Sequence, residues 1–180
     1  NDRLEQLVIE RTSSLKKANR ELQQLASIDQ LTGIGNRHML NSWLEKQSDE
    51  ADFVVMMIDI DHFKQINDRF GHKIGDHALV EFARYISDNT RREDLVVRWG
   101  GEEFIIIYKN MTLNNALKLA DNLRLNIESM NILPNRERMT VSIGISKFIK
   151  LHFENAILAA DTALYQAKKS GRNKTVVFSG

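Results

Sequence analysis

Two apolar segments flank a pair of glycines near the middle of the chain, in Leu95-Val-Val-Arg-Trp-Gly-Gly-Glu-Glu-Phe-Ile-Ile-Ile-Tyr108. Both segments, 95–99 and 103–108, are short and rich in β-branched side chains, which favours strands. The two glycines predict a tight hairpin turn with positive φ at both central positions. Because a hairpin joins antiparallel strands, this stretch excludes an all-parallel sheet.

Strand and helix patterns alternate on either side of the hairpin. The continuously apolar run 53–59 predicts a buried strand, and a helix is expected to begin at Asp76. The inward positions of that helix are Leu79, Phe82, Ala83 and Ile86. After the hairpin we expect a helix with Ala116, Leu119, Ala120, Leu123, Ile127 and Met130 inward, a strand over 139–146, a helix over 155–169 stopped at Gly171, and an edge strand over 174–178. This order predicts an α+β fold, with helices flanking a largely antiparallel central sheet.

The amino-terminal stretch has a different pattern. Apolar side chains recur at alternating spacings of four and three along Leu4, Val8, Arg11, Leu15, Ala18, Leu22 and Leu25, where Arg11 is the one charged position. Two interpretations remain open, a parallel two-stranded coiled coil or a surface helix packed on the domain. Turn-forming residues over 29–37 should end this helix. We therefore expect a helical segment over 1–28 and a globular domain over 29–180.

Composition excludes several classes of protein. The 180 residues suffice for one domain of ordinary size, and a hydrophobic share of 42% with 27% charged residues is typical of globular chains. A net charge of +1 gives no support for nucleic-acid or anionic-membrane binding. The absence of cysteine excludes disulfides, thiol catalysis and thiolate metal sites, and is consistent with the cytosol.

No targeting or membrane-spanning segment is visible in the sequence. The longest apolar run, 53–58, is far shorter than the roughly 20 residues that span a bilayer. The first residue is Asn rather than Met, so we expect a piece of a longer protein, with an upstream sensor domain in the missing part. A cytoplasmic location is expected for this piece, and an inner-membrane anchor elsewhere in the parent protein stays open.

Acidic residues occur at two positions that packing does not explain. Asp59 and Asp61 follow the apolar run and point to the same side, because strand side chains alternate. Asp61 has a simple interpretation as the N-cap of a helix beginning at His62. Asp59 has none, and an unpaired charge at the end of a buried strand is costly, so it needs a cation.

The second acidic position is Glu102-Glu103, at the tip of the hairpin. Taken alone, these acids could simply be solvated. If the hairpin pairs beside the 53–59 strand, however, Asp59 and Glu102 converge at one edge of the sheet. Oxygen-only ligands suit Mg²⁺ better than Zn²⁺, and Mg²⁺ in such sites generally brings phosphates.

Residues suited to a nucleotide lie close to these acids in sequence. Lys64 lies one turn into the helix that follows Asp59. Lys168 and Arg172 are four apart at the end of a helix, where they suit either phosphate or the helix carboxyl terminus. Asn67 and Asp76 offer an amide and a carboxylate. A carboxylate can accept both guanine N1–H and the 2-amino group, although the residues alone leave the base open.

The chain resembles GGDEF domains, in the variant with Glu at the third position of the name-giving motif. The matching blocks, in order, are Asp29-Gln-Leu-Thr-Gly-Ile-Gly-Asn-Arg37, Ile58-Asp-Ile-Asp-His-Phe-Lys64, Asn67-Asp-Arg-Phe-Gly-His72 with Gly75-Asp76, Arg98-Trp-Gly-Gly-Glu-Glu-Phe104, Val141-Ser-Ile-Gly144 and Ala163-Leu-Tyr-Gln-Ala-Lys-Lys-Ser-Gly-Arg-Asn173. Together the resemblance covers 29–178. It implies a fold similar to the palm of polymerases and nucleotide cyclases, and a diguanylate cyclase activity that joins two GTP into cyclic di-GMP plus two pyrophosphate across a homodimer.

Roles for single residues are also implied by the resemblance. The metal, Mg²⁺ or alternatively Mn²⁺, would be held by Asp59, the Ile60 carbonyl and Glu102, with Glu103 at a second metal or acting as the base. Asn67 and Asp76 would hold guanine, His72 would lie close to the nucleotide, and Lys64, Lys168 and Arg172 would neutralise the triphosphate and the departing pyrophosphate.

One further block, Arg91-Arg-Glu-Asp94, resembles the RxxD site at which this family binds its product as an inhibitor. Arg91 suits phosphate and the guanine edge, and Asp94 suits guanine N–H groups. The alternative is a solvated loop before a strand.

For the whole chain, the main alternative to a cyclase is an inactive domain that binds GTP or cyclic di-GMP; an adenylyl-type cyclase and a pure dimerisation module are further alternatives.

Overall fold

The computed structural model describes residues 3, 6, 11, 12 and 27–179. The seam predicted from Leu4 to Leu25 lies outside these residues, apart from Arg11. Its interpretation as a coiled coil or as a surface helix therefore stays a prediction. The fold below concerns 27–179.

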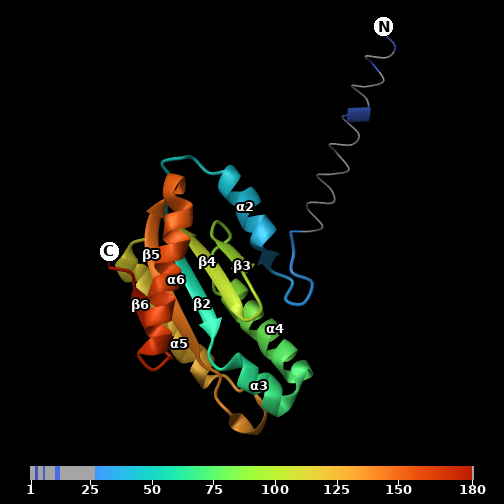
Figure 1. The fold of residues 1–180 in the computed structure, drawn as a ribbon, viewed down its shortest axis with the longest axis vertical. Coiled ribbons are helices and arrows are strands. Elements are labelled where there is room, and N and C mark those ends of the chain that lie inside the picture. Colours follow the sequence, from blue (N-terminus) through green and yellow to red (C-terminus); the bar gives the residue numbers. More distant parts are fainter. Residues whose placement is uncertain (1–2, 4–5, 7–10, 13–26, 180) are drawn as a thin grey trace.

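The core is a six-stranded sheet with the strand order β1-β3-β4-β2-β5-β6 (Figure 1). The strands are β1 (Gly35–Asn36), β2 (Asp52–Ile60), β3 (Leu95–Arg98), β4 (Glu103–Lys109), β5 (Val141–Ile149) and β6 (Thr175–Val177). The four central strands pair antiparallel, and only the short edge strands β1 and β6 pair parallel with their neighbours. The predicted α+β fold with a largely antiparallel sheet is confirmed.

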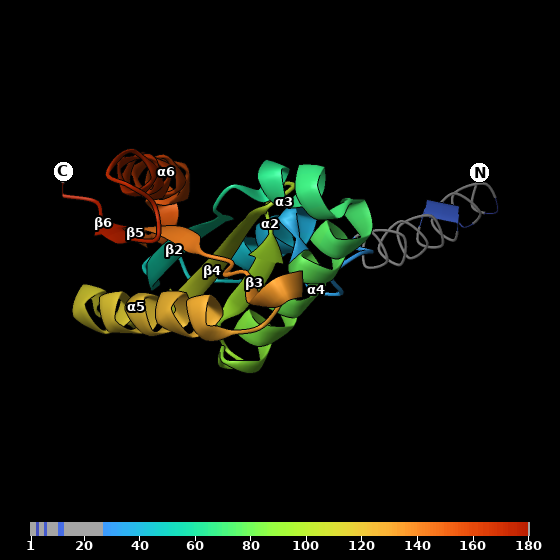
Figure 2. The same cartoon turned by 90° about the horizontal axis from the view of Figure 1, so that it is seen from below.

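Helices cover both faces of this sheet (Figure 2). They are α2 (Arg37–Glu45), α3 (Phe63–Phe70), α4 (His72–Asp88), α5 (Leu113–Ser129) and α6 (Phe153–Lys169), with short 3-10 turns over Pro134–Arg136 and Lys150–His152. Side chains from α3, α4 and α5 belong to one buried cluster, and side chains from α2 and α6 to the other.

The position of strand β2 between two helical layers explains why its sequence is apolar without interruption. Its alternate residues Val54, Met56 and Ile58 enter the cluster with α4 and α5, whereas Phe53, Val55 and Met57 enter the cluster with α6. Because both faces of the strand are covered, polar side chains would be buried on either one. The predicted buried strand is therefore confirmed, and it lies at the centre of the sheet.

The hairpin is confirmed, but its predicted turn is wrong. Neither Gly100 nor Gly101 has a positive φ. The connection is longer than two residues, since the amides of Trp99 and Gly100 both donate to the carbonyl of Glu103, at 2.8 and 3.2 Å. The Glu103 side chain lies over Gly100: a Cβ there would be 2.7 Å from a carboxylate oxygen of Glu103, which would have to move aside.

Several element boundaries also differ from the prediction. Helix α4 begins at His72 rather than Asp76, because Gly71, with φ 83°, interrupts the helical backbone just before His72. Leu119 of α5 was expected to face inward but is 41% exposed. The short β1 and helix α2 were not predicted; α2 is capped by the Asn36 side chain, which accepts from two amides of the first turn. Strand β5 runs over 141–149 instead of 139–146.

A separate finding concerns membranes: across the described part of the chain, every helix is too short or too polar to cross a bilayer.

Helix α6 lies directly on strand β5 at Gly144. A Cβ at this position would overlap the carbonyl oxygen of Ala160 and the amide nitrogen of Leu164, both backbone atoms of α6 that cannot rotate away. We predict that Gly144→Ala lowers the free energy of unfolding by about 1–3 kcal/mol or more. Chemical denaturation measures this loss. Gly101→Ala is the matched control, because a Cβ at Gly101 meets no atom within 4 Å; equal losses in both variants would contradict the prediction.

Candidate active site

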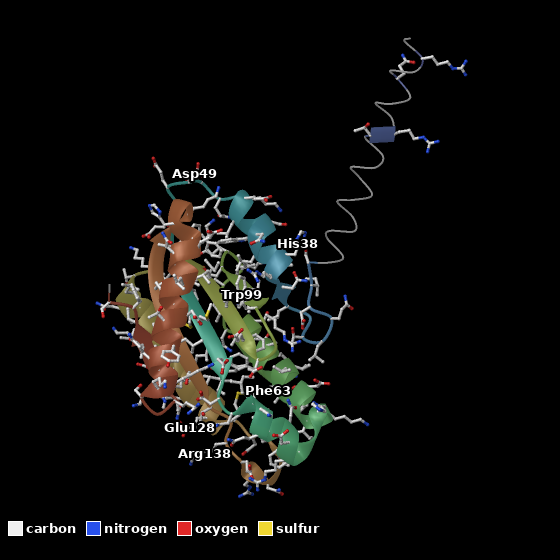
Figure 3. The ribbon with its side chains drawn as sticks, in the orientation of Figure 1. His38, Asp49, Phe63, Trp99, Glu128 and Arg138 are labelled. Carbon is white, nitrogen blue, oxygen red and sulfur yellow. The ribbon has the colours of Figure 1, made fainter. Side chains whose placement is uncertain are left out.

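The carboxylates singled out in the sequence meet at one edge of the sheet. In the register of β2 and β4, Asp59 lies opposite Glu103. The amide of Ile60 donates to the carbonyl of Glu102 at 3.2 Å. The expected convergence of Asp59 and Glu102 is therefore observed. This edge lies beside the start of α3, where Figure 3 labels Phe63.

Asp59 is an almost fully buried acid, with 6% of its surface exposed. Burial raises the pKa of its carboxyl to about 6, and the negative charges of Glu102 and Glu103 add to this effect. Lys168 acts in the opposite direction, with its Nζ 2.8 Å from Asp59 Oδ2. The pKa stays raised, so a single lysine does not offset the burial and the neighbouring acids. The site is thus short of positive charge.

The donor atoms at this edge fit a hard cation. They are carboxylate oxygens of Asp59, Glu102 and Glu103 together with the backbone carbonyl of Ile60, and oxygen donors are those that Mg²⁺ and Mn²⁺ prefer. Within 27–179, no group of three or more His, Cys, Asp or Glu side chains is already gathered as a metal cage. The fit therefore rests on the type of donor and on the excess negative charge around Asp59.

Asp61 does not act as the predicted N-cap. Helix α3 begins at Phe63, and its N-cap residue His62 has φ 57° and no capping side-chain hydrogen bond. Asp61 is instead buried, with 4% exposed, and accepts from the hydroxyls of Thr140 (2.8 Å) and Ser142 (2.6 Å). The N-cap interpretation fails because these partners come from β5 and the segment before it, which lie far away in sequence.

Asn67, Asp76 and His72 lie around the junction of α3 and α4. The Asn67 amide oxygen fills the space that a Cβ at Gly75 would need, so the two helices touch there. Asp76 follows Gly75 directly and is exposed, as is His72 at the first position of α4. The close approach at Gly75 thus places the Asn67 amide beside the residue that precedes Asp76.

The predicted cations differ in their surroundings. Lys168 pairs with Asp59, which favours a role at the site over a general interaction with the carboxyl end of α6. Lys64 is exposed on the first turn of α3. Arg172 is exposed just after α6 and has a left-handed backbone, with φ 62°.

Contacts at the hairpin tip were missed at the sequence level. Arg98 donates to the carbonyl of Gly101 at 2.7 and 3.1 Å and pairs with Asp29 at 3.0 Å. Burial acts to raise the pKa of Asp29, but hydrogen bonds from Thr32 and Arg98 outweigh it and lower that pKa. The only signal in the sequence was the turn-rich block beginning at Asp29, which was assigned no partner.

A hollow of about 450 Å³ lies beside these contacts. The guanidinium of Arg37 stacks on the Trp99 ring at 4.2 Å, and Figure 3 labels Trp99 and His38 in this region. The lining residues are Asp29, Asn36, Arg37, His38, Arg98, Trp99, Gly100 and Gly101. The turn block 29–37 thus helps to shape the surroundings of the loop that carries Glu102.

Arg91 and Asp94 share one turn, since the Asp94 amide donates to the Arg91 carbonyl at 3.1 Å. Arg91 is exposed, whereas Asp94 is only 8% exposed. Its Oδ1 accepts from the Lys109 amide at 2.9 Å, and its Oδ2 is buried without a hydrogen-bond partner. Burial raises the pKa of this carboxyl. The solvated-loop alternative is therefore wrong for Asp94.

Comparison with known proteins agrees with this geometry. The sequence model described as "Diguanylate cyclase, GGDEF domain" matches residues 26–174, which is most of the chain. This chain belongs to the GGDEF family. The response regulator PleD of Caulobacter vibrioides is 40% identical over 164 residues, covering 85% of this chain and 36% of PleD. The chain spans less than half the length of the curated relatives it matches.

Solved structures show the same fold. The coiled coil and GGDEF domain of DgcB from Caulobacter crescentus, in complex with c-di-GMP, superposes with a TM-score of 0.77 at 25% identity, covering 97% of this chain and 98% of that one. The diguanylate cyclase SiaD from Pseudomonas aeruginosa, in complex with its activator SiaC, gives a TM-score of 0.77 at 31% identity, covering 98% and 71%.

The raised pKa of Asp59 predicts a dependence of stability on pH in metal-free buffer. At pH values between the ordinary pKa of 3.8 and the raised pKa of about 6, this carboxyl is protonated to a greater extent in the folded protein than in the unfolded chain. The free energy of unfolding contributed by Asp59 therefore falls as the pH rises through this window. Asp59→Asn removes the effect, so relative to the parent the variant should gain about 1–3 kcal/mol between pH 4 and pH 7.

Denaturation of both proteins in a chelator at several pH values measures this difference. Added Mg²⁺ should stabilise the parent more than Asp59→Asn at pH 7, because the bound cation offsets the buried charge. A constant difference between the two proteins across the pH range would contradict the prediction.

Proposed function

We propose that this chain is a diguanylate cyclase, which condenses two GTP into cyclic di-GMP and two pyrophosphate. The observation that carries the proposal is the meeting of Asp59, Glu102 and Glu103 beside Lys168 at one sheet edge, in a chain of the GGDEF family. In the reaction, the 3′ hydroxyl of each GTP attacks the α-phosphorus of the other. Two phosphodiester bonds form, two bonds to pyrophosphate break, and two protons are released.

The acids are proposed as the metal-binding part of the site. Asp59, the Ile60 carbonyl and Glu102 would hold Mg²⁺, or alternatively Mn²⁺, with Glu103 at a second metal or as the base that takes the proton of the hydroxyl. A bound cation supplies charge stabilisation for the attacking and leaving oxygens. The excess of negative charge around Asp59 supports this assignment, because a cation relieves it.

The remaining site residues are proposed to bind GTP. Asn67 and Asp76 would recognise the guanine edge, and the contact of Asn67 with Gly75, the residue before Asp76, supports this. His72 would lie beside the nucleotide. Lys64, Lys168 and Arg172 would neutralise the triphosphate and then the departing pyrophosphate. Lys168 would be able to leave Asp59 and pair with a phosphate instead, since both partners are anionic.

A homodimer follows from the chemistry of the reaction. The attacking hydroxyl and the attacked phosphorus belong to different GTP molecules, so two domains must face each other, and linking them raises their effective concentration. The amino-terminal heptad would provide that link as a parallel coiled coil. The matching coiled coil and GGDEF domain of DgcB supports this arrangement. An upstream sensor domain in a longer, cytoplasmic or membrane-anchored protein would control it.

Product inhibition is proposed at Arg91 and Asp94. Arg91 is exposed and has only a loose ion pair, with Glu93 at 3.7 Å, which a phosphate could replace. Asp94 carries a carboxylate oxygen that lacks a hydrogen-bond partner among the described residues. Bound cyclic di-GMP would offer a guanine N–H group to that oxygen. Structures of relatives in complex with c-di-GMP support product binding by this kind of domain.

Incubation with GTP and Mg²⁺, followed by chromatography of the products, tests the function. The parent should form cyclic di-GMP, and Glu102→Gln should lose about a hundredfold or more of the turnover, because it removes a negative charge where the metal is expected. Thermal unfolding should show an intact fold, since Glu102 is only half-buried. Glu50→Gln, in the exposed loop before β2, is the control that should retain full turnover.

Absence of cyclic di-GMP at high protein concentration would refute the cyclase. Calorimetry with GTP would then decide whether the chain is the alternative, an inactive nucleotide-binding domain. Turnover of Glu102→Gln within a few-fold of the parent would refute the metal role while leaving the cyclase intact.

The inhibitory site has its own variant. Arg91→Ala should raise the cyclic di-GMP concentration for half-inhibition about tenfold or more, the loss expected for a hydrogen bond to a charged group. Initial rates, measured at increasing amounts of added cyclic di-GMP, give this value. Arg92→Ala is the matched control, because Arg92 is the exposed neighbour of the same type. Equal sensitivity of Arg91→Ala and the parent would contradict the assignment.

A further inference from the structure

The buried carboxylate of Asp61 connects the two segments that carry the proposed metal and phosphate groups. It follows Ile60 directly in the chain. Its Oδ2 accepts from the backbone amide of Asn173 at 3.0 Å, and Asn173 directly follows Arg172. Only 4% of the Asp61 surface is exposed, so this hydrogen bond lies in the protein interior. The end of β2 and the segment after α6 are therefore held together at one atom.

The backbone of the segment after α6 has an uncommon conformation. Arg172 and Asn173 both have left-handed dihedrals, with φ 62° and 46°. This backbone is unfavourable for Arg, whereas Asn tolerates it better, so surrounding contacts must hold the turn. One such contact is the bond from the Arg172 amide to the Ala167 carbonyl at 3.0 Å.

Asn173 supplies the remaining contacts through its side chain. Its Oδ1 accepts from Arg124 Nη1 at 3.0 Å, and its Nδ2 donates to Glu128 Oε2 at 3.0 Å. Both partners lie on α5. Glu128 is further paired with Arg138 at 3.2 Å, and Figure 3 labels these two residues at the same end of the molecule. Asn173 is thus fixed on one side by Asp61 and on the other by α5.

A purely structural role of Asn173 would explain its bonds to α5. It would not explain why these bonds fix the segment that carries Arg172. The strained residue is Arg172, an exposed cation for which the described contacts provide no ion pair. Its backbone is held from both sides while its guanidinium is left available. Such an arrangement suits a group that must meet a ligand in one fixed position.

We infer that Asn173, held by Asp61 and α5, is a positioning residue that sets Arg172 for the triphosphate of the bound nucleotide. This inference rests on the proposed function, because it takes the phosphate role of Arg172 from there. It goes further in assigning a task to Asn173, Arg124 and Glu128.

The test measures binding rather than turnover. The probe is 3′-deoxy-GTP with Mg²⁺, which lacks the attacking hydroxyl and is not consumed, and guanosine is the probe without phosphates. Asn173→Gly keeps the left-handed backbone accessible but removes both side-chain bonds. We expect affinity for 3′-deoxy-GTP to fall about fivefold to tenfold, with affinity for guanosine unchanged. Asn110→Gly is the matched control, an exposed Asn with φ 50° at the far end of β4.

A double-mutant cycle separates positioning from a general structural effect. If Asn173 acts through Arg172, then Asn173→Gly should cause little further loss when Arg172→Ala is already present. Equal losses in the two backgrounds, no loss in Asn173→Gly, or a matching loss for guanosine would each overturn the inference. Unchanged affinity in Arg172→Ala would refute the proposed phosphate role, and the inference would fall with it; absence of turnover alone would leave this binding test unaffected.

A rescue keeps the inference testable if Asn173→Gly unfolds. Asn173→Asp places a carboxylate against Glu128 and should weaken 3′-deoxy-GTP binding. Adding Glu128→Gln restores an amide donor opposite a carboxylate acceptor and should return the affinity to within about twofold of the parent, because the same bond is made with exchanged partners. Failure of the double variant to recover, while it remains folded, would overturn the inference.

Discussion

The site depends on a central strand that is buried on both faces and ends in acids. Strand β2 packs against α4 and α5 on one side and α6 on the other, so Asp59 lies where water reaches it poorly. A carboxylate in such a place is costly unless positive charge offsets it. Lys168 provides part of this charge, while burial keeps the pKa of Asp59 raised. The same packing that stabilises the domain thus creates the demand for a cation.

Two long-range clamps hold the loops around this acid. Arg98 ties the hairpin tip to Asp29 at the start of the domain, and Asp61 ties the end of β2 to Asn173. Each clamp joins segments far apart in the chain, and each uses a charged group with several hydrogen bonds. Such bonds are stronger and more directional than neutral ones. The loops that carry the proposed metal-binding and phosphate-binding residues are therefore held by polar contacts, while the sheet beneath them is held by apolar ones.

Glycines allow several of these close approaches. Gly144 lets α6 lie on β5, which brings Lys168 over the end of β2, and Gly75 makes room for the Asn67 side chain. Gly101 differs, because a Cβ there would meet nothing within 4 Å and its φ is not positive. The fold itself therefore does not require glycine at 101.

The sequence alone predicts the order of the elements from β2 onward, the buried strand 53–59, the hairpin and the acids at their ends. These follow from local patterns, since apolar periodicity and the need to compensate buried charge are visible along the chain. Tertiary structure alone decided the partners of Asp61, the pairing of Asp59 with Lys168, the bridge between Asp29 and Arg98, and the left-handed backbone at Arg172. Local preference favoured an N-cap at Asp61 and a positive-φ turn at Gly100-Gly101. At Asp61, contacts with residues far apart in sequence replace the cap, because a buried carboxylate takes whichever donors the packed strands bring to it. At the hairpin, the amides of Trp99 and Gly100 bond to the Glu103 carbonyl and close a longer turn instead.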